Sequence, residues 1–225
     1  MPSFESLFLA GLLVAIGLSA LALFAGLRRG RSGPAAEALG QGRFAAALAA
    51  VPAGRPTDRE ELYAAAVAAR HLLDLDRAGE LLGRILATDP GDGEALLEGG
   101  LVAAYRGDFE EAARGLAAAL SKRSDLAESI TLHQAWLALR RGDRAAARRL
   151  FDEVEVPLET KLRSDLGEGE PLFSEWFLHA AILWSTFGDR ERAEWAAAAA
   201  RQAAPESRLW ERAGVTPSSA TIELP

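Results

Sequence analysis

The chain has 225 residues, 49% of them hydrophobic, and a formal net charge of −7, which suits one domain with or without an appendage. Residues 34–225 carry 22 basic and 31 acidic residues, a net charge of −9, which argues against a nucleic-acid-binding protein with its basic surface. The chain has no cysteine, which excludes disulfides, thiol catalysis, a lipoprotein anchor and cysteine-ligated metal sites.

The segment 7–27, "LFLAGLLVAIGLSALALFAGL", contains no charged residue. At about 1.5 Å per residue a helix of this length spans about 30 Å, the thickness of the hydrocarbon layer of a bilayer. A cleavable signal peptide would begin with basic residues and have a shorter apolar core, whereas only Glu5 precedes this segment. We therefore predict a retained transmembrane helix, with residues 1–33 as the anchor and its basic flank.

The charges that flank this segment predict its orientation. Arg28, Arg29 and Arg31 follow it, and basic residues stay on the cytoplasmic side. The abundant alanine, together with arginine in place of lysine, is typical of a GC-rich bacterial genome. We therefore expect a single-pass protein of the bacterial inner (cytoplasmic) membrane, with its N-terminus outside and residues 28–225 in the cytoplasm. The opposite orientation, with a periplasmic domain, is the alternative.

A stripe of small residues lies along one face of this predicted helix, where such residues allow a second helix to approach closely. It consists of Gly11, Ala15, Ser19, Ala22 and Gly26. The stripe favours packing against another membrane protein, although alanine and glycine are also common in membrane helices generally.

Four similar turns follow along the chain, in "LDLDRAGELL", "YRGDFEEAAR", "RRGDRAAARR" and "TFGDRERAEW". Their aspartates, Asp74, Asp108, Asp143 and Asp189, are spaced by 34, 35 and 46 residues, with about a dozen helix-forming residues on each side. At three turns a glycine precedes the aspartate. Glycine can end a helix in the left-handed conformation and aspartate can cap the next helix, so each turn predicts a helical hairpin.

Small residues recur at fixed distances from each turn, where two antiparallel helices would cross. They are Ala66, Gly100, Ala135 and Ala181 before the turns and Ala78, Ala112, Ala147 and Ala193 after them. Larger residues between the units, such as Leu82, Leu116 and Phe151, would fill the space between neighbouring hairpins.

A helix–turn–helix repeat of about 34 residues with this pattern resembles the tetratricopeptide repeat. The resemblance implies an all-α fold in which an α-solenoid of helical hairpins follows the transmembrane helix. The repeats would cover 59–92, 93–126, 128–156 and 174–206, with an insertion at 157–173, where Pro157 and Pro171 break the pattern. Residues 34–58 would form a partial N-terminal repeat, and 207–225 a capping helix and tail.

The resemblance also implies a concave groove that binds a protein partner. The residues facing it would be Tyr63, Val67, Arg70 and His71 in the first unit, Leu97, Leu101, Ala104 and Tyr105 in the second, Leu132, Trp136, Leu139 and Arg140 in the third, and Leu178, Ile182 and Ser185 in the fourth. Repeat domains of this family that hold the acidic tails of chaperones use Lys and Asn where this chain has Tyr63 and Val67. Binding of chaperone tails is therefore not expected.

No motif recommends an enzyme or a cofactor site. His71, His133 and His179 are 62 and 46 residues apart, so no metal site is expected, and HExxH, GxSxG and a Gly-rich phosphate loop are absent. We expect a noncatalytic scaffold or adaptor that binds a partner protein near the membrane, or an accessory subunit of a membrane complex, with no cofactor and no small-molecule substrate. The alternatives are an assembly or quality-control adaptor of envelope biogenesis and an enzyme of unrecognised type.

Overall fold

The computed structural model describes residues 33–52, 57–164 and 171–212, and every element of secondary structure within these residues is a helix. The helices are α2 (Pro34–Gly40), α3 (Phe44–Ala49), α4 (Arg59–His71), α5 (Leu75–Thr88), α6 (Gly93–Arg106), α7 (Phe109–Lys122), α8 (Ala127–Arg140), α9 (Arg144–Ser164), α10 (Ser174–Phe187), α11 (Arg190–Ala203) and α12 (Leu209–Arg212). Two short 3₁₀ helices, η1 (Ser124–Leu126) and η3 (Pro171–Phe173), precede α8 and α10.

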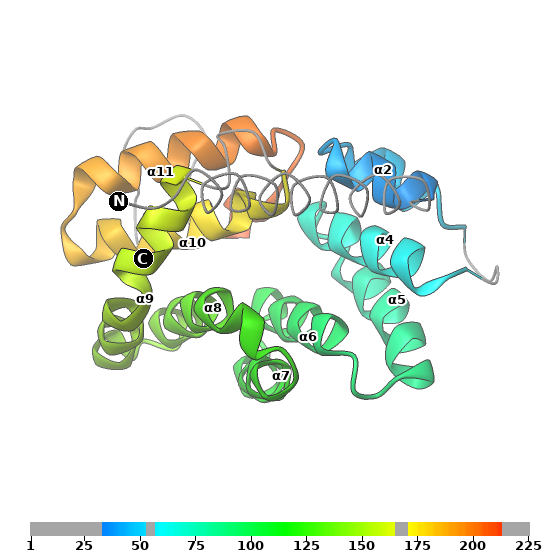
Figure 1. The fold of residues 1–225 in the computed structure, drawn as a ribbon, viewed down its shortest axis with the longest axis horizontal. Helices are drawn as coiled ribbons and strands as arrows, with labels where there is room; N and C mark the ends of the chain where they lie inside the picture. The colour runs from blue at the N-terminus through cyan, green and yellow to red at the C-terminus, as the bar shows by residue number, and fades with distance from the viewer. Residues whose placement is uncertain (1–32, 53–56, 165–170, 213–225) are drawn as a thin grey trace, which may run out of the picture. The chain divides into compact units, whose positions relative to one another are not determined.

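Consecutive helices pair into hairpins that follow one another along an arc (Figure 1). The turns have the chemistry that their sequences predict. Gly107, Gly142 and Gly188 adopt positive φ angles of 92°, 80° and 93°. The carboxylates of three of the four turn aspartates accept a hydrogen bond from the first turn of the next helix, and Asp108 is the exception.

The first of these turns lacks the glycine. Leu73 stands in its place and adopts a φ of 60°, in the left-handed region that is unfavourable for a residue with a Cβ atom. Its side chain packs against the hydrophobic core, and this burial offsets part of the backbone strain.

The small residues lie where the two helices of each hairpin cross, as predicted, and the alanines among them are all buried. The closest approach is between α6 and α7. A Cβ atom added to Gly115 would lie 2.8 Å from the Cα atom of Gly100, closer than two such atoms can pack. The pair of glycines therefore sets the distance between these two helices.

Glu61 fixes the start of α2 against α4. Its carboxylate accepts hydrogen bonds from the free backbone N–H groups of Ala35 and Ala36, at 3.0 and 3.2 Å.

The first and last hairpins of the array also meet. The turn between α2 and α3 approaches both η3 and the end of α11, because Gly42 lies close to Pro171 and to the carbonyl of Ala203. The array formed by the described residues from 34 onward is thus closed on itself.

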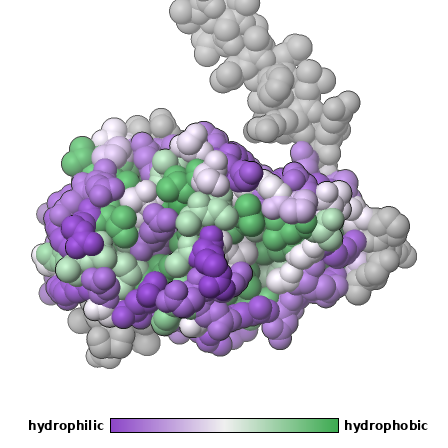
Figure 2. Space-filling view, turned by 90° about the horizontal axis from the view of Figure 1, so that it is seen from below, coloured by the Kyte–Doolittle hydropathy of each residue, from purple (hydrophilic) through white to green (hydrophobic). Residues whose placement is uncertain are grey.

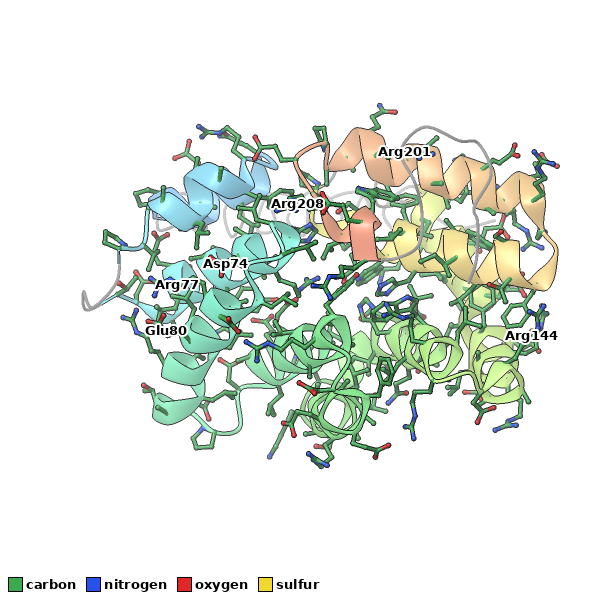
Figure 3. All side chains as sticks on the ribbon, turned by 180° about the vertical axis from the view of Figure 1, so that it is seen from behind. Asp74, Arg77, Glu80, Arg144, Arg201 and Arg208 are labelled. Carbon is green, nitrogen blue, oxygen red and sulfur yellow. The ribbon has the colours of Figure 1, made fainter. Side chains whose placement is uncertain are left out.

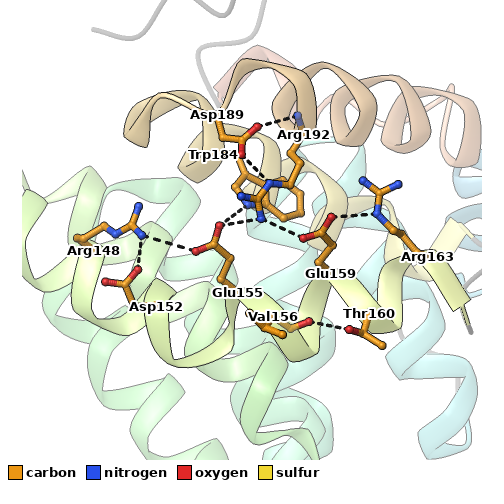
Figure 4. Close-up of polar contacts among 10 residues, drawn as sticks. All are labelled: Arg148, Asp152, Glu155, Val156, Glu159, Thr160, Arg163, Trp184, Asp189 and Arg192. Carbon is orange, nitrogen blue, oxygen red and sulfur yellow. Dashed lines mark hydrogen bonds and ion pairs between the residues drawn. The ribbon is translucent and has the colours of Figure 1, made fainter.

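Helix α9 differs from the expected repeat. Pro157 was expected to end the helical pattern, whereas α9 runs for 21 residues through Pro157 to Ser164. Arg192 of α11 contacts this helix on both sides of the proline. Its Nη1 atom lies 3.0 Å from Glu155 Oε1 and 2.9 Å from Glu159 Oε2, so one guanidinium binds carboxylates on both sides of the proline (Figure 4). The buried side chains of Leu158 and Leu162 anchor the extra turns.

The predicted transmembrane helix, 7–27, and its small-residue stripe lie outside the described residues. Within the part of the chain that the structure describes, no helix combines the length and apolarity needed to cross a membrane.

Substituting the two kinds of glycine in α6 and α7 should have opposite effects. Gly115→Ala should lower the free energy of unfolding by about 1–3 kcal/mol, because the new methyl group forces the α6 and α7 backbones apart. Gly99→Ala is the matched control. A Cβ atom at Gly99 meets nothing within 4 Å, so this change should raise stability by up to about 1 kcal/mol through helix propensity. Urea denaturation followed by circular dichroism would measure both, and an equal effect of the two variants would contradict the close crossing.

Candidate functional site

The structure places the expected groove residues inside the molecule. Eleven of the fifteen expected groove residues are buried, and Tyr63, Leu139, Arg140 and Ser185 are half-buried. Side chains of the array fill the space that the arc of helices encloses (Figure 3). The buried candidates are Val67, Arg70, His71, Leu97, Leu101, Ala104, Tyr105, Leu132, Trp136, Leu178 and Ile182. The expectation of an open groove lined by these residues is therefore corrected, because helix α10 and the core cover them in the closed array.

Three of the buried side chains form an ion cluster between the first helices of three hairpins. Arg70 of α4 donates from Nε to Glu98 Oε2 of α6 at 2.8 Å. Its Nη1 lies 2.7 Å from Glu175 Oε1 of α10. None of these three residues is more than 6% exposed. An arginine keeps its charge in proteins, so the two carboxylates compensate a cation that the interior would otherwise not tolerate.

A chain of hydrogen bonds continues from Glu175 through three more buried side chains. Tyr105 Oη donates to Glu175 Oε1 at 2.9 Å, and it lies 3.1 Å from His179 Nε2. Because the only proton of the hydroxyl points to the carboxylate, His179 Nε2–H must donate to the tyrosine oxygen. Neutral His179 then has a bare Nδ1, which accepts from His133 Nδ1–H at 2.9 Å. The donors all point towards Glu175, and we refer to Arg70, Glu98, Glu175, Tyr105, His179 and His133 as the interior polar cluster.

Aromatic stacking holds the imidazoles in place. The ring of Trp136 stacks on that of His179 with centroids 3.9 Å apart, and His133 meets His179 edge-on at 5.0 Å. The indole Nε1 of Trp136 is buried without a hydrogen-bond partner. The side-chain positions of the cluster therefore depend on packing as well as on charge.

Burial determines the protonation states of the cluster. It lowers the pKa of His133 to about 3 and the pKa of His179 well below its ordinary value, with the positive charge of Arg70 adding to both effects. Burial also raises the pKa of the Tyr105 hydroxyl and of the Glu98 carboxyl, although Arg70 partly opposes the shift at Glu98. The histidines are thus neutral near pH 7, as the hydrogen-bond chain requires.

The third histidine lies elsewhere. His71 stacks on Phe44 with ring centroids 4.3 Å apart, and its Nδ1 lies 3.0 Å from Ser207 Oγ. Among the residues that the structure describes, no three His, Asp or Glu side chains come together in a way that could hold a metal ion. His133 and His179, which occupy matching positions in neighbouring units, contact each other directly.

Of the six members of the cluster, the sequence suggested only Arg70 and Tyr105 as site residues, and it considered His133 and His179 only as a metal site that is not expected. Glu98 and Glu175 did not enter the sequence argument at all. Each is a carboxylate within an apolar stretch of a first helix, in "ALLEGGL" and "FSEWFLH". A charged residue on the face of the expected groove residues, such as Leu101 and Ile182, is the signal that could have revealed them, because a charged residue on an inward face needs a buried partner.

A second set of charges lies on the outside, around Arg192 (Figure 4). Besides Glu155 and Glu159, Arg192 contacts Asp189, while Trp184 Nε1 donates to Glu155 Oε1 at 3.0 Å. These groups are partly exposed, so water and salt screen them and each pair contributes little by itself. On the face shown in Figure 2, hydrophobic residues are interspersed among hydrophilic ones.

No protein-family model, curated protein or solved structure was found to match this chain. The sequence pattern and the geometry of the described residues therefore carry the functional argument.

Tyr105→Phe tests the interior polar cluster. The change keeps the ring but removes the hydroxyl that joins Glu175 to His179, so it should lower the free energy of unfolding by about 1–3 kcal/mol. Tyr63, the other tyrosine of the chain, lies outside the cluster, and Tyr63→Phe should cost less than about 0.5 kcal/mol. Chemical denaturation of both variants measures the difference, and equal losses would contradict the bonding described here.

The neutral histidines predict that stability falls in mild acid. Burial lowers the pKa of His71, His133 and His179 in the folded state, so between pH 7.5 and 5 the unfolded chain binds more protons than the folded one. The loss approaches about 1.4 kcal/mol per pH unit for each histidine below pH 6.5. The raised pKa of Glu98 has the opposite effect on stability, because the folded chain keeps this proton to a higher pH than the unfolded chain does.

Thermal unfolding of the full chain at several pH values measures this slope. His133→Gln should reduce the slope by about the contribution of one histidine. A melting temperature that does not change between pH 7.5 and 5 would show that the histidines are not held neutral.

Proposed function

We propose that this protein is a noncatalytic scaffold, held at the bacterial inner membrane by residues 7–27, whose tetratricopeptide-like repeats bind a partner protein. The observation that supports the proposal most is the sequential array of helical hairpins, because such arrays present extended surfaces to other polypeptides. Membrane attachment would keep this surface among other membrane proteins at a high effective concentration.

The closed array limits where a partner can bind. The interior polar cluster is sealed from solvent, so a partner of the closed form would contact the exposed faces of the hairpins or the half-buried side chains of Tyr63 and Arg140. These two side chains are half-buried members of the expected groove. Arg140 lies over the ring of Trp136, with its Cζ atom 5.4 Å from the ring centroid. Arginine and aromatic residues are frequent anchors of protein interfaces.

The second candidate is a permanent accessory subunit of a membrane complex, which the small-residue stripe of the predicted membrane helix favours. The two candidates differ in how tightly a membrane partner is held. Stoichiometric recovery after detergent extraction supports the subunit, while a soluble, salt-sensitive partner supports the scaffold. Proximity labelling from the C-terminus of the chain would identify neighbours and their compartment in either case.

The membrane helix can be tested with matched substitutions. Gly11→Leu with Ala15→Leu should reduce co-purification of a membrane partner at least about tenfold, because bulky residues on the stripe block close helix packing. Gly17→Leu with Ala20→Leu is the control, since at 100° per residue these positions face away from the stripe. Equal recovery with both pairs would exclude packing through the stripe, and a chain that stays in the soluble fraction would exclude the anchor.

A further inference from the structure

The segment Ser207–Arg212, which we term the C-terminal clasp, joins parts of the array that are far apart in the sequence. The backbone N–H of Arg208 donates to the carbonyl of His71 at 2.7 Å, at the end of α4. The carbonyl of Arg212 accepts from Arg140 Nη1 at 3.2 Å, at the end of α8. Ser207 Oγ adds the contact with His71 Nδ1. Six residues thus connect the first full hairpin to the third.

Two adjacent side chains anchor the clasp. Leu209 is fully buried and Trp210 is 7% exposed, whereas Arg208, Glu211 and Arg212 are exposed. The guanidinium of Arg201 from α11 lies 5.7 Å from the Trp210 ring centroid. A short segment with an aliphatic and an aromatic anchor, polar flanks and a backbone hydrogen bond has the features of a bound peptide.

The clasp is also suited to release. Helix α12 has four residues, too few to be stable without its contacts. The His71 carbonyl that it caps is one of the acceptors left free at the end of α4, so any peptide N–H in this place would satisfy it. The turn that follows contains Leu73, whose positive φ is unfavourable. The clasp therefore docks beside a turn whose backbone conformation is itself unfavourable.

We propose that the C-terminal clasp occupies, in cis, a binding site for a short polypeptide, and that a partner segment with adjacent aliphatic and aromatic residues displaces it. The inference rests on the proposed scaffold function and specifies the chemistry of its partner. Displacement frees the ends of α4 and α8, including Arg140, for the incoming chain. The clasp then keeps the site closed until a competing segment is present.

Peptide binding to the full-length protein in detergent tests the proposal. The probe is a fluorescein-labelled peptide of residues 206–212, and the control peptide carries Leu209→Ala and Trp210→Ala. The protein variant with Leu209→Ala and Trp210→Ala should bind the probe at least tenfold more tightly than the unmodified chain, because its own clasp no longer competes. The matched control is a variant with Leu172→Ala and Trp176→Ala, one aliphatic and one aromatic change outside the clasp, which should bind the probe as the unmodified chain does.

Equal binding of the probe to all three proteins, or equal binding of the two peptides to the clasp variant, would overturn the proposal. Circular dichroism checks that the variants are folded. If the clasp variant does not fold, hydrogen exchange of the unmodified chain tests whether the clasp is released. The Arg208 amide should exchange at least tenfold faster than the core amides of α4 and α8, and exchange at the same rate as the core would overturn the proposal. These results do not depend on membrane attachment, so a failed clasp and a failed scaffold function are distinguishable.

Discussion

The buried charge of Arg70 is the constraint on which the interior depends. A guanidinium in the core cannot lose its proton, and removing it from water costs several kcal/mol unless carboxylates and hydrogen bonds compensate it. Glu98 and Glu175 provide this compensation from α6 and α10, so the first, second and fourth full hairpins must approach one another for the charge to be tolerated. Tyr105, His179 and His133 extend the same requirement to α8.

This requirement changes what a repeat array of this length can do. An open array would expose its concave side to partners, whereas here the chain fills that side with its own side chains. The closure is completed by the contact of the α2–α3 turn with Pro171 and Ala203 and by the C-terminal clasp. Partner binding then takes place on the outer faces and edges, or at the clasp after it is released.

Much of the fold can be predicted from local chemistry. The glycine–aspartate turns, the small residues at the helix crossings and the order of the hairpins follow from backbone preferences and sterics, which act over a few residues. Pro157 shows where local reasoning fails. A proline within a helix removes one hydrogen bond, and here the burial of Leu158 and Leu162 in the array compensates that loss together with contacts from Arg192, which lies 35 residues away.

The sequence by itself determined the class of fold and the side chains that face inwards, because helix periodicity and turn residues are local patterns that can be recognised within a few residues. It identified Arg70, Tyr105 and Trp136 as members of one inward face without showing whether that face is open. Only the tertiary structure decided that the face is closed, since closure depends on pairing one buried cation with carboxylates 28 and 105 residues away. Such pairings produce no repeating pattern in the sequence, because the curvature of the whole array decides which residues meet.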